Sequence, residues 1–156
     1  MIDPGLTPRS GTYALVLSSS ATLQLQIGKL GTLPLVRGFY VYVGSAFGPG
    51  GLKARLGHHQ CAPRQAHWHI DYLRRATRLE QVWFTYDPTY REHQWARLMG
   101  TAMRGIIPLE GFGASGCACR SHLYYFRDRP SAGRYAGLVR CYHPEHEDTH
   151  FLLVVQ

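Results

Sequence analysis

Arg55 and His59 are the first residues whose types and spacing suggest chemistry. The segment 52–60 is predicted to be a helix, and steps of three and four residues return to one helical face. That face also carries Leu52 and Leu56, which favour the core. A guanidinium and an imidazole at the margin of an apolar stripe can bind an anion and transfer a proton. The structural alternative is an arginine that reaches solvent beside a hydrogen-bonded core histidine.

Glu92 is a second polar residue in an apolar setting, on a helix predicted to begin at Pro88. The apolar stripe of that helix consists of Trp95, Leu98, Met99 and Ala102. Glu92 extends this stripe by one turn, and a partly desolvated carboxylate there needs an arginine or a metal ion as partner. An ion pair with Arg55, or an exposed first-turn glutamate favoured by the helix dipole, is the structural alternative.

Cys117-x-Cys119-x-x-His122 suggests a metal-binding loop, with Cys61 or Cys141 as the candidate fourth ligand. Structural zinc sites typically place two residues between paired cysteines and add a second half, whereas one residue and one half are present here. We therefore do not expect zinc at Cys117, Cys119 and His122. A redox-sensitive thiol pair is the other interpretation.

Composition points to one basic globular domain with an anionic partner. The 156 residues are 45% apolar, which is enough for a hydrophobic core and argues against disorder. Lysine and arginine number 17 against ten acidic residues, so the net charge of +7 favours nucleic acid over a membrane surface. No apolar run reaches the roughly 18 residues of a membrane span. Residues 1–10 lack the apolar centre of a signal peptide. We expect a cytoplasmic protein with reduced cysteines, and the sequence indicates no oligomeric state.

Hydrophobic periodicity predicts the elements that must position these residues. The expected strands are residues 12–17, 21–27, 35–43, 80–86 and 122–126. The expected helices are residues 52–60, 67–75 and 88–103. The first two strands are expected to pair as a hairpin, and the third places Tyr40 and Tyr42 on one face. Early strands followed by helices indicate an α+β fold with a small central antiparallel sheet flanked by helices.

The expected domain organisation has three parts. Residues 1–10 form an N-terminal arm, and residues 11–126 form the folded domain. Residues 127–156 are more polar and are predicted to be a loosely attached extension, with 151–155 as a candidate strand.

The order of these residues resembles the GIY-YIG nuclease signature. Its matching parts are Gly11-Thr12-Tyr13, Tyr42-Val43-Gly44, Arg55 with His59, and Glu92. The combination is more specific than either tripeptide and spans residues 11–126. A further similarity is to an uncharacterised branch of small stand-alone members of that family, and it extends over GFYVYVGSA, HWHIDYL and residues 111–126.

The resemblance implies a metal-dependent endonuclease that hydrolyses phosphodiester bonds in DNA with one Mg²⁺ or Mn²⁺ ion. By position, Glu92 is the metal ligand, and Arg55 steadies the phosphate. His59 accepts or relays a proton, while Tyr13 orients or deprotonates the attacking water with Tyr42 as its partner across the sheet. The residues expected to contact substrate are Gly44, Ser45, Lys53, Trp68 and His69.

Departures from the family pattern leave two other functions open. Thr12 replaces isoleucine, the spacing from Tyr13 to Tyr42 is long, and Ser45 stands where many members have lysine. A nucleic-acid-binding module without catalysis is the main alternative, and a zinc-stabilised interaction protein is the third.

The block His67–Tyr72 is not explained by the nuclease mechanism. Core packing is its first interpretation, ahead of a pocket or a base stacked on Trp68.

Overall fold

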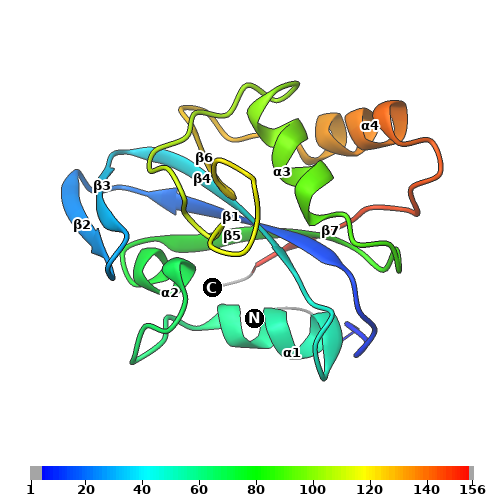
Figure 1. Ribbon diagram of the computed structural model, residues 1–156, viewed down its shortest axis with the longest axis horizontal. Coiled ribbons are helices and arrows are strands. Elements are labelled where there is room, and N and C mark those ends of the chain that lie inside the picture. Colours follow the sequence, from blue (N-terminus) through cyan, green and yellow to red (C-terminus); the bar gives the residue numbers. More distant parts are fainter. Residues whose placement is uncertain (1–4, 155–156) are drawn as a thin grey trace.

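The computed structural model describes residues 5–154, which fold into three layers (Figure 1). Its strands are β1 Thr12–Ser19, β2 Leu23–Ile27, β3 Gly31–Leu35, β4 Gly38–Ser45, β5 Arg78–Thr85, β6 Leu123–Phe126 and β7 His150–Leu153. Its helices are α1 Gly51–Gln60, α2 His69–Arg74, α3 Glu92–Gly100 and α4 Ala132–Tyr142. One face of the central sheet is covered by α1 and α2, and the other by α3 and α4. The predicted α+β fold, with a small antiparallel sheet flanked by helices, is confirmed.

The central strand of the sheet is β1, in the order β6-β4-β1-β5-β7 with every pairing antiparallel. Residues 12–17 of β1 are all buried because helices cover both faces of the sheet. Alternation along the strand directs Tyr13 and Leu15 toward α1 and α2, and Ala14 and Val16 toward α3 and α4.

The tyrosine face predicted for the third strand is also confirmed. On β4, Tyr40 and Tyr42 belong to the same side of the sheet as Tyr13, while Val41 and Val43 pack on the opposite side. In the register Tyr13 lies opposite Gly44 and Leu15 lies opposite Tyr42. The two motif tyrosines therefore face the layer that contains Arg55 and His59.

The predicted hairpin between the first two strands is wrong. Both edges of β1 are already paired, with β4 on one side and β5 on the other, so β1 has no edge left for β2. Instead β2 pairs with β3 as a separate two-stranded ribbon. A tight turn joins the two, in which Leu30 N–H donates to Ile27 O over 2.9 Å and Gly28 has a positive φ of 48°. Ile27 and Leu33 anchor this ribbon in the core.

Helix α3 is shorter than predicted at both ends. The Asp87 carboxylate accepts hydrogen bonds from Thr89 N–H (2.9 Å) and Arg91 Nε (3.2 Å), which holds the segment after Pro88 in a turn. The helix begins only at Glu92. It ends at Gly100 because the next residue, Thr101, leaves helical geometry with φ −110° and ψ −83°.

The C-terminal extension is integrated into the domain rather than loosely attached. Tyr135 of α4 is fully buried between Trp83 and Trp95, each 5.3 Å away between ring centroids, and its hydroxyl donates to Trp95 O over 3.0 Å. The sequence did not predict this helix. The candidate strand at the end is present as β7, paired with β5, although Val155 lies outside the described residues.

Residues 5–10 of the N-terminal arm are held against the start of α1. Leu52 N–H donates to Arg9 O over 2.9 Å, and Lys53 N–H donates to Thr7 O over 3.3 Å. These bonds satisfy backbone groups that a helix start otherwise leaves free. Within the described chain, no helix combines the length and apolar character required to cross a bilayer.

Candidate active site

Tyr13 and His59 form the buried centre of the candidate site. Tyr13 Oη lies 2.8 Å from His59 Nε2, and each side chain is only 1% exposed. Burial lowers the pKa of His59 to about 3, so the imidazole is neutral at neutral pH. Burial, followed by the neighbouring Tyr42, raises the pKa of Tyr13 well above its ordinary value. At neutral pH the pair is therefore a phenol hydrogen-bonded to an uncharged imidazole.

Tyr42 lies beside this pair and reaches the surface. Its ring centroid is 6.4 Å from that of Tyr13 and 6.3 Å from that of His59. The side chain is half-buried, and burial together with the negative charge of Glu92 raises its pKa. Tyr42 is thus a neutral hydroxyl at neutral pH, able to donate a hydrogen bond to an anion.

Arg55 supplies the positive charge of the site. Its guanidinium lies over the ring of Trp68, 4.5 Å from the centroid, which orients the fork by cation–π contact. Its charge and hydrogen bonding lower the pKa of Tyr13, although burial of that phenol has the larger, opposite effect. Arg55, His58 and Trp68 line a pocket of about 230 Å³. Trp68 is 36% exposed and Arg55 is half-buried, so an anion from solvent can reach this charge.

Gly44 is needed for the close approach of Tyr13. A Cβ built at position 44 would lie 2.5 Å from both Oη and Cζ of Tyr13. From the sequence, the reason for a glycine at this position was expected to be contact with substrate. The structure gives a different reason, because the ring of the motif tyrosine fills the space that a side chain at position 44 would occupy.

Glu92 approaches the tyrosines from the opposite layer, as the first residue of α3. Tyr90 Oη donates to Glu92 Oε2 over 2.9 Å, and Ser45 Oγ lies 3.5 Å from the same hydroxyl. The Glu92 side chain is 13% exposed. Its charge raises the pKa of Tyr42, which places the carboxylate within electrostatic range of the tyrosine pair. Among the described residues Arg55 is not its ion-pair partner.

Tyr90 is a site residue that the sequence did not indicate. It bridges Ser45 to Glu92, and its ring lies 5.4 Å from that of Phe47 between centroids. Both aromatic side chains are exposed, Tyr90 by 47% and Phe47 by 39%. Its position two residues before Glu92 was the only available signal, since the contact with Ser45 depends on how α3 meets β4.

The remaining predicted substrate residues have different surroundings. Lys53 is exposed on α1 and is free to contact a ligand. His69 instead has a structural role, because its Nδ1 accepts a hydrogen bond from Gly113 N–H over 2.9 Å and its ring packs on Phe112. The packing interpretation of the block His67–Tyr72 therefore holds for His69 but not for Trp68.

Asp71 organises the start of α2 beneath the site. Its carboxylate accepts from the backbone N–H groups of His67 (2.8 Å) and Trp68 (2.9 Å) and contacts His58 Nε2 at 3.1 Å. Asp71, His58 and His59 are close enough together to hold a metal ion. Because both Asp71 oxygens already accept hydrogen bonds, we interpret this group as a capping network that orients Trp68.

The five motif groups converge from β1, β4, α1 and α3 where β1 starts and β4 ends. Tyr13 and His59 are sealed from solvent, whereas Tyr42, Arg55 and Glu92 are partly exposed. A hydroxyl, a guanidinium and a carboxylate are thus accessible, and a phenol–imidazole pair lies behind them. This set can bind a phosphate, hold a hard cation through one carboxylate and pass a proton inward.

The cysteines of the sequence motif belong to a second group of side chains beside Glu92. Cys117, Cys119 and His122 gather with His93, the residue after Glu92, in a group of four potential metal ligands. Cys61 and Cys141 are exposed free thiols outside this group. Neither of them is the fourth member that the sequence suggested.

Comparison with known proteins places the chain in a family. Neither the curated proteins nor the solved structures yield a significant match. A family model, described as the domain of unknown function DUF123, matches residues 12–139. The match covers β1 through most of α4, and therefore includes all five converging groups and the four-residue cluster. The chain belongs to the DUF123 domain family.

Proposed function

We propose that this protein is a metal-dependent endonuclease of the GIY-YIG type that hydrolyses phosphodiester bonds in DNA. One observation carries the proposal: Tyr13, Tyr42, Arg55, His59 and Glu92 come together from four elements at one end of the sheet. A fold stabilised by packing alone has no need of these polar groups in this order. The net charge of +7 favours a polyanionic substrate.

Arg55 binds the scissile phosphate in this proposal. Its stacking on Trp68 limits its motion, and a planar fork can donate two parallel hydrogen bonds to phosphate oxygens. The charge also stabilises the additional negative charge that develops at phosphorus. Tyr42, as a neutral and partly exposed phenol, donates a further hydrogen bond to the same group.

Tyr13 and His59 handle the proton of the attacking water. Burial disfavours a free phenolate at Tyr13, so the phenol passes its proton to His59 Nε2, 2.8 Å away, as it takes one from water. The imidazole is neutral, and because burial lowers its pKa to about 3, the relay requires the negative charge of the bound phosphate to stabilise the imidazolium as it forms. This relay avoids an isolated buried anion, which would be far more costly than the bonded pair.

Glu92 would hold the divalent cation. Its carboxylate is partly exposed, and oxygen is the ligand type that Mg²⁺ and Mn²⁺ prefer. A cation bound there would neutralise charge on the phosphate and the leaving oxygen. Tyr90 donates to Glu92 Oε2 and so sets the orientation of the carboxylate.

Cleavage of labelled DNA tests the proposal. Single-stranded, duplex and branched DNA are incubated with Mg²⁺ or Mn²⁺ and the wild type, Glu92→Ala, or Asp128→Ala as a matched control. Asp128 is an exposed carboxylate outside the site. The proposal requires cleavage by the wild type and by the control, with loss of cleavage in Glu92→Ala. Cleavage retained by Glu92→Ala would refute it.

A binding module that does not cleave is the second candidate. The observation in its favour is that Tyr13 and His59 are only 1% exposed. Such a module would bind DNA with strong dependence on salt, leave it intact with every metal, and bind equally well as Glu92→Ala. The same reactions therefore distinguish the two functions.

A further inference from the structure

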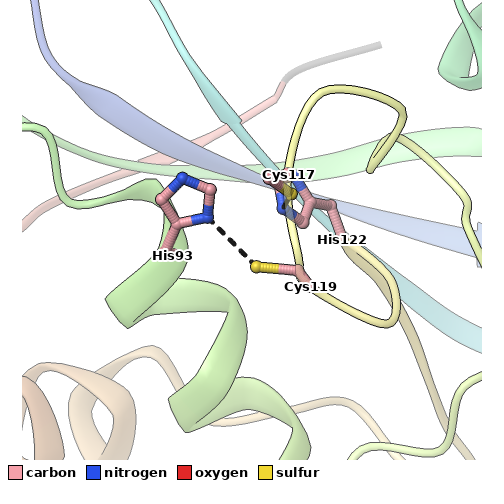
Figure 2. A group of neighbouring side chains, drawn as sticks. All are labelled: His93, Cys117, Cys119 and His122. Atoms are coloured by element: carbon pink, nitrogen blue, oxygen red, sulfur yellow. Dashed lines mark hydrogen bonds between the residues drawn. The ribbon is translucent and has the colours of Figure 1, made fainter.

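We propose that His93, Cys117, Cys119 and His122 bind one zinc ion as a structural site. Figure 2 shows these four side chains directed toward a common point, with His93 on α3 and the other three on the segment leading into β6. One ligand atom from each lies within 4.8 Å of all the others. His93 was not part of the sequence motif and supplies the fourth ligand that the motif lacked.

The distances within the cluster suit tetrahedral zinc. His93 Nδ1 lies 3.1 Å from Cys119 Sγ, and His122 Nε2 lies 3.4 Å from Cys117 Sγ. With Zn–S bonds of about 2.3 Å and Zn–N bonds of about 2.0 Å, a sulfur and a nitrogen on one zinc are separated by about 3.5 Å. Both contacts are close to that separation, so the four ligands need only small side-chain movements to close on an ion.

The chemistry of the ligands selects zinc over the hard cation proposed at Glu92. Two thiolates and two imidazoles form the Cys₂His₂ set of structural zinc sites, whereas Mg²⁺ requires oxygen. The sequence disfavoured zinc because the spacing between Cys117 and Cys119 is short and only one half of a site was visible. A ligand from α3 supplies the missing half, and no spacing rule links it to this loop.

His122 is oriented for this role by Glu92. The ring is 1% exposed, its Nε2 faces Cys117, and its Nδ1 lies 3.4 Å from Glu92 Oε2. A metal-bound histidine usually directs its other ring nitrogen to a carboxylate or carbonyl, which fixes the ring. The arrangement of carboxylate, histidine and cluster follows that pattern.

The position of the cluster gives the ion a structural purpose. The described residues 101–122 connect α3 to β6 through turns, with one isolated bridge from Ile106 to Tyr125. Connections of this length without helix or strand are uncommon in compact domains. An ion held by His93, Cys117, Cys119 and His122 would tie this connection to α3. The cluster also borders a pocket of about 840 Å³ between α3 and the connection, which gives the ion a route from solvent.

Metal content measured on the full chain tests the site. The protein is purified without chelator, reconstituted with zinc, desalted and analysed for metal. The test variant is Cys117→Ser/Cys119→Ser, and the matched control is Cys61→Ser/Cys141→Ser, which removes two exposed thiols instead. We expect about one zinc per chain in the wild type and the control, and a decrease of roughly tenfold or more in the test variant. Equal zinc content in the two variants would overturn the proposal.

Cobalt substitution of the unmodified wild type keeps the proposal testable if the cysteine variant fails to fold. Tetrahedral Co²⁺ with thiolate ligands should show intense d–d bands and a sulfur-to-cobalt charge-transfer band. A weak spectrum typical of octahedral Co²⁺ would refute the site. A Cys117–Cys119 disulfide in protein purified under reducing conditions would refute it as well. Because these measurements monitor metal and not cleavage, their failure is distinct from failure of the proposed nuclease activity.

Discussion

Replacing Gly44 by alanine should destabilise the protein, because the ring of Tyr13 occupies the space of the new methyl group. The added Cβ would lie 2.5 Å from Oη and Cζ and 3.0 Å from Cε1 of Tyr13, against 3.4–4 Å for ordinary contact. The ring cannot easily withdraw, since it is 1% exposed and bonded to His59. Overpacking of this kind costs about 1–3 kcal/mol, which lowers Tm by roughly 2–4 °C for each kcal/mol.

Gly57→Ala is the matched control for this substitution. Gly57 is an exposed residue within α1, and a Cβ there would have nothing within 4 Å. The same chemical change should therefore stabilise the protein by about 0.5–1 kcal/mol through helix propensity. Urea denaturation gives both free energies of unfolding, and an unchanged m-value would show that the unfolded states are comparable.

A double-mutant cycle then tests the assigned cause. In a Tyr13→Leu background the ring is gone, so most of the cost of Gly44→Ala should disappear and the two substitutions should be strongly non-additive. Purely additive free energies, or a Gly44→Ala protein as stable as the wild type, would refute the close packing of Tyr13 on Gly44.

Three further outcomes are expected. Asp71→Asn should cost about 1–3 kcal/mol at pH 7. Burial favours a higher pKa for Asp71, but hydrogen bonds from two backbone N–H groups and from His58 outweigh it and lower the pKa. The stability advantage of the wild type over Asp71→Asn is therefore fully present above the unfolded pKa of about 3.9 and is lost as pH falls through the lower folded pKa. Urea denaturation at several pH values measures this loss. Arg55→Lys should reduce the cleavage rate about 100-fold or more with folding retained, because a lysine lacks the fork; a rate within a few fold of the wild type would contradict this role. Glu92→Gln should weaken zinc binding about 10-fold through His122, as measured by competition with a chelator, and unchanged affinity would show that this carboxylate does not support the zinc ligand.

Local periodicity was sufficient to predict most of the helices and strands and the apolar face of the helix that contains Arg55 and His59. The helix at residues 52–60 was expected to place Arg55 and His59 beside Leu52 and Leu56, and in the structure both leucines and His59 are buried while Arg55 reaches the surface. Such a pattern depends only on the helical repeat, so it can be recognised without knowledge of the rest of the fold.

Pairing and helix boundaries were less predictable because they depend on competition between distant segments. The strand β2 has a clear alternating pattern, yet its partner is β3 because β4 and β5 occupy both edges of β1. The start of α3 depends on the side chain of Asp87, which holds the preceding turn. The burial of Tyr135 depends on Trp83 and Trp95, which belong to other elements.

The amino-acid sequence by itself determined the fold class, the basic charge and the types of chemical group available to this protein. Only the tertiary structure decided which groups meet: Tyr13 with His59, Tyr90 with Ser45, and His93 with the two cysteines of the loop. The physical reason is that each of these contacts joins elements whose separation is set by sheet order and helix packing. The pattern of side chains predicts which residues share a face of one element. The distance between the faces of two elements depends on how the whole chain folds.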